Sequence, residues 1–178
     1  MLGISGKGYY FRFQYFYYLP YSNLYTLKIR RPQAASKLTT MPDKIRVVIV
    51  DDHQVIRTSW KILFGTDERF DVVAVFKSGE EAIEAVPALE ADVILMDINM
   101  FPLNGFDTTS RLLQIDPGIR VIGISANNYP GYAQKMISLG ARGFVTKSSP
   151  FEELTTAVWL VSEGETYICE EISRLMEN

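Results

Sequence analysis

Five polar residues of the types that phosphoryl transfer requires follow short apolar runs in the sequence. Two carboxylates come directly after the run 45–50, and a third follows the run 93–96. A hydroxyl and an ammonium group follow two later runs, so the set is Asp51, Asp52, Asp97, Ser125 and Lys147. If these runs are parallel strands, their carboxyl ends meet at one edge of a sheet, where open α/β sheets bind ligands. We therefore expect the five side chains to form one site.

The three carboxylates of this set need a cation between them. Without one they would repel each other and raise their own pKa values. Mg²⁺ takes oxygen ligands and is the expected ion, for which Mn²⁺ could substitute. Asp97 would then have one oxygen on the metal and one free to attack phosphorus. Lys147 would supply positive charge, and Ser125 a hydroxyl donor, to the phosphoryl oxygens.

From residue 45 onward, short β-branched runs alternate with longer amphipathic stretches, which predicts a parallel sheet with crossover helices. Capping signals predict helices that start after Ser78 and after Ser149, and Pro130 and Gly140 bracket another. The fold class is therefore α/β, a doubly wound sheet. The five predicted strands are 45–50, 72–76, 93–96, 120–124 and 143–146.

The first 42 residues differ in composition from the rest. They carry six Lys or Arg residues and no acid, and seven of the ten tyrosines lie between Tyr9 and Tyr25. Their aromatic residues show no clean helical period, which disfavours a membrane-binding or nucleic-acid-binding helix. We predict a basic aromatic extension over 1–42, a folded domain over 43–168, and a tail or the start of a linker over 169–178.

Composition excludes several classes of protein. Hydrophobic residues make up 47% of the 178 residues and charged residues 22%, which is typical of a globular domain. The net charge is −3, so the part after residue 42 carries −9 (12 basic and 21 acidic residues), which disfavours a broad nucleic-acid surface. The lone Cys169 excludes an intramolecular disulfide, and no apolar run is long enough for a membrane span. A cytoplasmic location is expected.

The motifs resemble the receiver domain of bacterial two-component response regulators. The resemblance lies in the stretches 47–53, 94–100, 124–126 and 143–147, and it covers about 120 residues. The triplet Asp51-Asp52-His53 and the stretch 164–168 are most similar to the NarL/FixJ (LuxR-type) subgroup of transcriptional regulators. This resemblance implies a flavodoxin-like (βα)5 fold, with five parallel strands in the order 2-1-3-4-5.

The same resemblance implies a role for each site residue. Asp97 is the phospho-acceptor, and Asp52 and Asp97 ligate Mg²⁺ directly. Asp51 acts largely through water, and the backbone carbonyl of Asn99 completes the protein's ligands. The implied partners are a sensor histidine kinase, which donates the phosphoryl group, and a second copy in a possible homodimer.

The resemblance also implies a switch. Ser125 would move toward the phosphoryl group, and Phe144 would turn inward to fill the space that Ser125 leaves. An aromatic residue in a buried strand is also commonly part of the core, so Phe144 has two readings. His53, the only histidine, is expected to pack at the start of the first helix.

Two departures from the family pattern stand out. Phe101 occupies the place of the usual proline, with Pro102 after it, while Gly105 keeps the place of the turn glycine. We expect a reshaped loop and an intact site. Lys147 is followed by Ser148 instead of proline, which removes the residue that favours a cis peptide there.

Two competing functions remain to be separated. Phosphatases of the haloacid-dehalogenase type need an acid two residues after the nucleophile, and this position holds Asn99. We therefore expect no enzymatic activity beyond self-phosphorylation and autodephosphorylation at Asp97.

About fourteen residues follow Gly164, too few for a helix-turn-helix domain, so specific DNA binding by this chain is not expected. The readings are a truncated transcriptional regulator and, as the alternative, a single-domain receiver acting as a phosphorelay or protein-interaction module.

Overall fold

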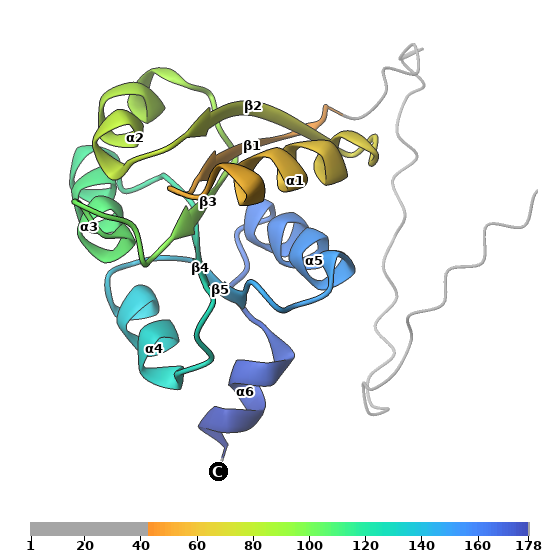
Figure 1. Cartoon of the computed structure of the whole chain (residues 1–178), viewed down its shortest axis with the longest axis vertical. Coiled ribbons are helices and arrows are strands. Elements are labelled where there is room, and N and C mark those ends of the chain that lie inside the picture. Colours follow the sequence, from red (N-terminus) through yellow and green to blue (C-terminus); the bar gives the residue numbers. More distant parts are fainter. Residues whose placement is uncertain (1–42, 178) are drawn as a thin grey trace, which may run out of the picture. The chain divides into compact units, whose positions relative to one another are not determined.

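The computed structural model describes residues 43–177. The predicted basic aromatic extension, 1–42, lies outside them. Figure 1 shows the described part as a twisted sheet with helices on both faces.

The sheet is parallel and has the order β2-β1-β3-β4-β5-β6 within the described residues. Its first five strands confirm the predicted fold class and the order 2-1-3-4-5. The sixth is a short strand that the sequence analysis did not foresee. The strands are β1 (Ile45–Val50), β2 (Phe70–Phe76), β3 (Val93–Asp97), β4 (Val121–Ser125), β5 (Gly143–Thr146) and β6 (Tyr167–Ile168).

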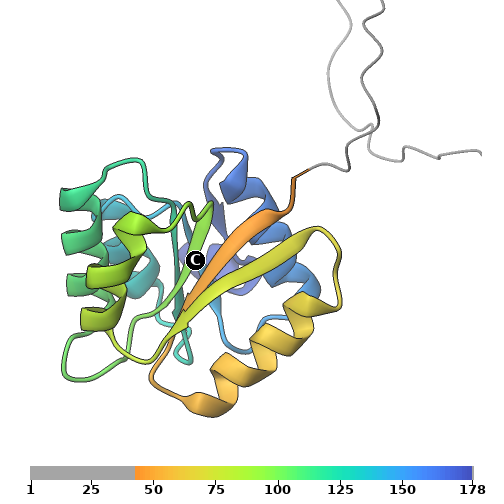
Figure 2. The same ribbon diagram turned by 90° about the horizontal axis from the view of Figure 1, so that it is seen from above.

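Helices cover both faces of the sheet, with α1 and α5 on one face and α2, α3 and α4 on the other (Figures 1 and 2). Strands covered on both sides are mainly apolar, and β3, β4 and β5 are buried along their whole length, with a polar residue only at the end of each. The helices are α1 (Gln54–Gly65), α2 (Gly79–Ala85), η1 (Val86–Ala88), α3 (Gly105–Ile115), α4 (Pro130–Ser138), α5 (Phe151–Ser162) and α6 (Glu170–Met176).

One of the two predicted helix caps is confirmed and the other is wrong. The Ser78 side chain accepts a hydrogen bond from the Glu81 backbone N–H (3.3 Å) at the start of α2, as expected of an N-cap. The α5 helix instead has Pro150 as its N-cap residue, without a side-chain cap. The Ser149 hydroxyl lies 3.2 Å from Thr146 Oγ1, because the chain enters this helix from the end of β5.

The segment predicted to be a tail or the start of a linker, 169–178, contains α6. Cys169 and Ile172 are fully buried, and α6 packs beside α4. The Glu153 carboxylate on α5 accepts hydrogen bonds from the Glu170 backbone N–H (2.8 Å) and from the Tyr167 hydroxyl (3.1 Å). Burial and the charge of Glu153 raise the pKa of Tyr167 to about 12. The first turn of α6 is therefore attached to α5.

No helix between residues 43 and 177 is both long enough and apolar enough to cross a membrane.

Gly105 sits where α3 starts beneath the end of β3. A Cβ atom at this position would lie 2.2 Å from the Asp97 carbonyl oxygen and 2.7 Å from Ile98 Cα, so backbone atoms leave no room for a side chain. We predict that Gly105→Ala lowers the free energy of unfolding by about 1–3 kcal/mol, the usual cost of overpacking. Urea denaturation followed by circular dichroism measures this.

Gly65, at the end of α1, provides the matched control because a Cβ atom there would meet no atom within 4 Å. Gly65→Ala should leave stability unchanged or raise it by about 0.4–1 kcal/mol. Equal effects of the two substitutions would contradict the close approach at Gly105.

Candidate functional site

The strand register brings the predicted site residues to one edge of the sheet. Val50 pairs with Met96, so the residues that follow, Asp51 and Asp97, lie side by side. Ser125 pairs with Thr146, and the backbone N–H of Lys147 donates to the Ser125 carbonyl oxygen (2.7 Å). Asp51, Asp97, Ser125 and Lys147 therefore meet at the carboxyl ends of four neighbouring strands.

Lys147 joins two buried carboxylates. Its Nζ lies 2.7 Å from Asp51 Oδ2 and 2.8 Å from Asp97 Oδ2, and neither aspartate side chain is exposed. Burial raises the pKa of Asp97, and the hydrogen bonds from Lys147 and Asn99 only partly offset this. Burial by itself lowers the pKa of Lys147, but its bonds to Asp51 and Asp97 outweigh burial and leave that pKa raised. Lys147 is therefore charged, and burial makes the ionised form of Asp97 less favourable than it is in water.

Asn99, in the loop after β3, contacts both the second carboxylate oxygen of Asp97 and the Ser125 hydroxyl. Asp97 Oδ1 accepts a hydrogen bond from the Asn99 backbone N–H (3.1 Å). The Asn99 side-chain amide reaches Ser125 Oγ at 3.5 Å, and the Asn127 backbone N–H donates to the same oxygen at 2.9 Å. Asn99 thus links the predicted phospho-acceptor to the predicted hydroxyl donor, a side-chain role that the sequence analysis missed.

The loop after β1 carries two further contacts that sequence reasoning did not find. His53 is the N-cap residue of α1, at the helix start as expected, but its Nδ1 lies 2.7 Å from Asp52 Oδ1. Arg57 donates from Nη1 to the Asp51 carbonyl oxygen (2.6 Å) and so ties α1 to the site. Arg57 lies six residues after Asp51, in the first turn of α1, and this spacing could have indicated the contact between them.

The acidic cluster fits a metal ion. Asp51, Asp52, His53 and Asp97 each offer a ligand atom within 4.8 Å of the others. Three carboxylates and the single ammonium of Lys147 leave a charge of −2, which a divalent cation would balance. The donors are mainly oxygen atoms, as hard cations prefer. These residues could therefore bind a metal ion, while the part assigned to the Asn99 carbonyl stays a prediction.

Phe144 is fully buried in this structure. A Cβ atom at Gly123 would lie 3.2 Å from the Phe144 ring and 2.8 Å from Met136 Cγ, so both side chains cover this glycine closely. This burial suits either reading of Phe144. Its role in a switch stays a prediction.

The loop that departs from the family pattern is also resolved. The Phe101 side chain is 84% exposed, and the peptide bond between Phe101 and Pro102 is cis. No cis peptide follows Lys147 in the described part of the chain. Asp97 and Lys147 nevertheless lie in contact, so the altered loop leaves their pairing intact.

Comparisons with known proteins agree with this arrangement. Residues 47–159 match the family model of the response regulator receiver domain. The transcriptional regulatory protein DegU of Brevibacillus brevis is 38% identical over 126 residues, which cover 71% of this chain and 53% of DegU. The response regulator GacA of Pseudomonas viridiflava is 32% identical, over 73% of this chain and 61% of GacA. The chain thus spans about half to three-fifths of the length of these curated relatives.

Among solved structures, the receiver domain of the putative response regulator NarL from Mycobacterium tuberculosis superposes with a TM-score of 0.66. It is 30% identical, and the match covers 70% of this chain and all of that one. The match to the family model over most of the chain, together with this shared fold, shows that the chain belongs to the family of two-component response regulator receiver domains.

Proposed function

We propose that this domain accepts a phosphoryl group on Asp97, with Mg²⁺ bound, and changes its surface in response. The observation that carries the proposal is the Lys147 ammonium held between two fully buried carboxylates, Asp51 and Asp97. An anion strained by burial, next to a fixed positive charge, is a suitable nucleophile for phosphorus. The donor we propose is a phosphohistidine of a sensor histidine kinase.

The transfer uses groups that the chain itself provides. An Asp97 carboxylate oxygen forms the new P–O bond while the P–N bond to the donor histidine breaks, and the histidine nitrogen leaves with the electron pair. Lys147 then pairs with a phosphoryl oxygen, and Ser125 donates its hydroxyl to another. Mg²⁺, held by Asp51, Asp52, Asp97 and the Asn99 carbonyl, would offset the negative charge that gathers on the transferring group. The domain catalyses only its own phosphorylation and dephosphorylation.

The response would run through Ser125 and Phe144. Moving the Ser125 hydroxyl toward Asp97 costs its present bond from the Asn127 N–H (2.9 Å) and leaves a gap above the sheet. Phe144, already buried, would fill that gap by packing alone, because its ring has no hydroxyl to hold either position. The phosphoryl group would thus shift a population of loop conformations.

The output we propose is signal transduction in the cytoplasm, leading to transcription regulation through dimerisation or another partner. DegU, the relative described above, is named as a transcriptional regulatory protein. We do not assign specific DNA binding to this chain itself. The partners are therefore the kinase and, in a homodimer, a second receiver.

Phosphorylation at Asp97 can be tested directly. With Mg²⁺ and acetyl phosphate, intact mass spectrometry should show a gain of one phosphoryl group, and Asp97→Asn should abolish it because the nucleophile is lost. Removal of Mg²⁺ with a chelator should have the same effect. Asp71→Asn, which changes an exposed acid on β2, is the matched control and should be phosphorylated like the wild type. Phosphorylation of Asp97→Asn would exclude Asp97 as the acceptor.

The raised pKa of Asp97 predicts how the metal-free protein responds to pH. A carboxyl group whose pKa is higher in the folded state destabilises the fold when ionised, and this cost disappears as pH falls through the folded pKa. At pH 7 without Mg²⁺, Asp97→Asn should therefore be more stable than the wild type, and the difference should shrink as pH approaches 4. Urea denaturation at several pH values measures it.

Mg²⁺ should reverse that order by stabilising the wild type more than the variant, since the cation offsets the charge of Asp97. If the wild type is more stable than Asp97→Asn in the absence of metal, the ionised Asp97 does not destabilise the fold and the prediction is wrong.

A further inference from the structure

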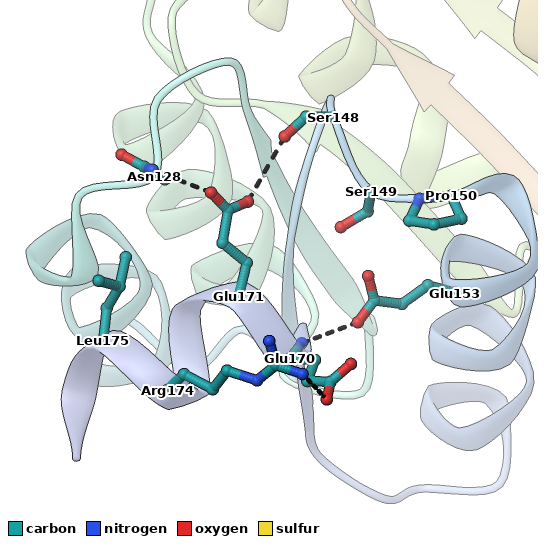
Figure 3. A pocket seen from close by; sticks show the side chains of 9 residues that line it. All are labelled: Asn128, Ser148, Ser149, Pro150, Glu153, Glu170, Glu171, Arg174 and Leu175. Atoms are coloured by element: carbon teal, nitrogen blue, oxygen red, sulfur yellow. Dashed lines mark hydrogen bonds and ion pairs between the residues drawn. The ribbon is translucent and has the colours of Figure 1, made fainter.

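A single carboxylate on α6 contacts both the loop that follows Ser125 and the chain on either side of Lys147 (Figure 3). Glu171 Oε1 accepts a hydrogen bond from the Asn128 side-chain amide (2.9 Å) in the loop after β4. Its Oε2 accepts one from the Thr146 hydroxyl (3.1 Å) at the end of β5 and lies 3.5 Å from the Ser148 hydroxyl. We call these four residues the Glu171 clasp.

The residues that Glu171 contacts in each loop are close to a site residue, Ser125 in the loop after β4 and Lys147 in the loop after β5. In the loop after β4, the Asn127 N–H donates to Ser125 Oγ and the Asn127 side chain accepts from the Tyr129 N–H, both at 2.9 Å, so Asn128 belongs to one hydrogen-bonded turn with Ser125. In the loop after β5, Lys147 lies between Thr146 and Ser148 in the sequence. A shift of either site residue must therefore strain the clasp.

The strand order sets the direction of that strain. Asp97 ends β3, on one side of β4, whereas α6 follows β6, on the opposite side. A movement of the turn that contains Ser125 toward a phosphoryl group on Asp97 would therefore carry it away from β6. Such a movement would lengthen the contact between Asn128 and Glu171, which is 2.9 Å in this structure.

We propose that occupation of the phosphoryl site opens the Glu171 clasp and loosens α6 from the end of the sheet. The inference rests on the function proposed above and assigns it a second output, located at the C-terminal helix. It also implies the converse. Because coupling between two sites is reciprocal, a closed clasp restrains Ser125 and weakens binding of a phosphoryl group or its mimic.

The physical character of the clasp suits a reversible contact. Glu171 is exposed, so breaking its bonds leaves no buried charge, and the hydrogen bonds from Asn128 and Thr146 lower its pKa and keep it ionised. The first turn of α6 has separate attachments, through the buried Ile172 and through the bond from the Glu170 N–H to Glu153. Opening the clasp therefore loosens α6 without unfolding the domain.

Amide hydrogen exchange of the full chain in Mg²⁺, with and without the phosphoryl mimic beryllofluoride, tests the proposal. In the wild type, the mimic should slow exchange in the loops that carry Ser125 and Lys147. It should also speed exchange in α6 by about fivefold, as expected for the loss of one net hydrogen bond. Glu171→Ala should show the faster α6 exchange without the mimic and should bind beryllofluoride about fivefold more tightly.

Glu170→Ala is the matched control, because it removes a neighbouring exposed carboxylate from α6 that pairs with Arg174 and makes no contact with the clasp. It should bind the mimic like the wild type. If the loops respond to the mimic while α6 does not, or if Glu171→Ala binds it with wild-type affinity, the clasp proposal is wrong and the proposed function stands. If the loops of the wild type do not respond at all, the proposed function fails and the clasp proposal fails with it.

Discussion

The arrangement at the edge of the sheet depends on one ion-pair network, in which a single ammonium contacts two buried carboxylates. Asp51 and Asp97 are both fully buried, and Lys147 contacts both. Removing Lys147 from this network would cost about 3–5 kcal/mol, because two buried carboxylates would be left without a cation. The rest of the fold can be understood as the framework that keeps these three groups together despite their desolvation.

That framework is mostly backbone. The parallel register fixes where each strand ends along the sheet. The close approach of Gly105 to the Asp97 carbonyl restricts the backbone of the turn after β3. A shift of one residue would move each side chain to the opposite face of the sheet and would displace the polar residues at the strand ends from the edge. The core therefore positions the strand ends, while the loops after β4 and β5 are held by side-chain hydrogen bonds that can exchange partners.

Much of this could be predicted from the sequence because the signals are local and repeated. The β-branched runs indicate buried strands, and five polar residues at their ends identify the functional edge without any knowledge of contacts. The Ser149 cap was wrong because a hydroxyl near a helix start can also bond to the preceding strand, and Thr146 supplies that partner. Helix α6 was missed since its packing depends on few apolar residues within a polar segment, chiefly the buried Cys169 and Ile172 with the partly buried Met176.

Other contacts could not have been read from any local pattern. Asn99 reaches Ser125 across 26 positions of the sequence, and Glu171 reaches Asn128 across 43. Such bonds join polar residues that are unremarkable one by one, and only the topology of the sheet brings them together.

The two edges of the sheet differ in length. Within residues 43–177, β6 contributes two residues at one edge, whereas β2 contributes seven at the other. Among the described residues β2 pairs only with β1, and a free strand edge of that length can accept a further strand from another chain through backbone hydrogen bonds. Any such extension of the sheet would take place next to β2, and four strands separate β2 from β6, which α6 follows. Assembly through the sheet edge and signalling through the C-terminal helix would therefore use opposite ends of the domain and need not compete.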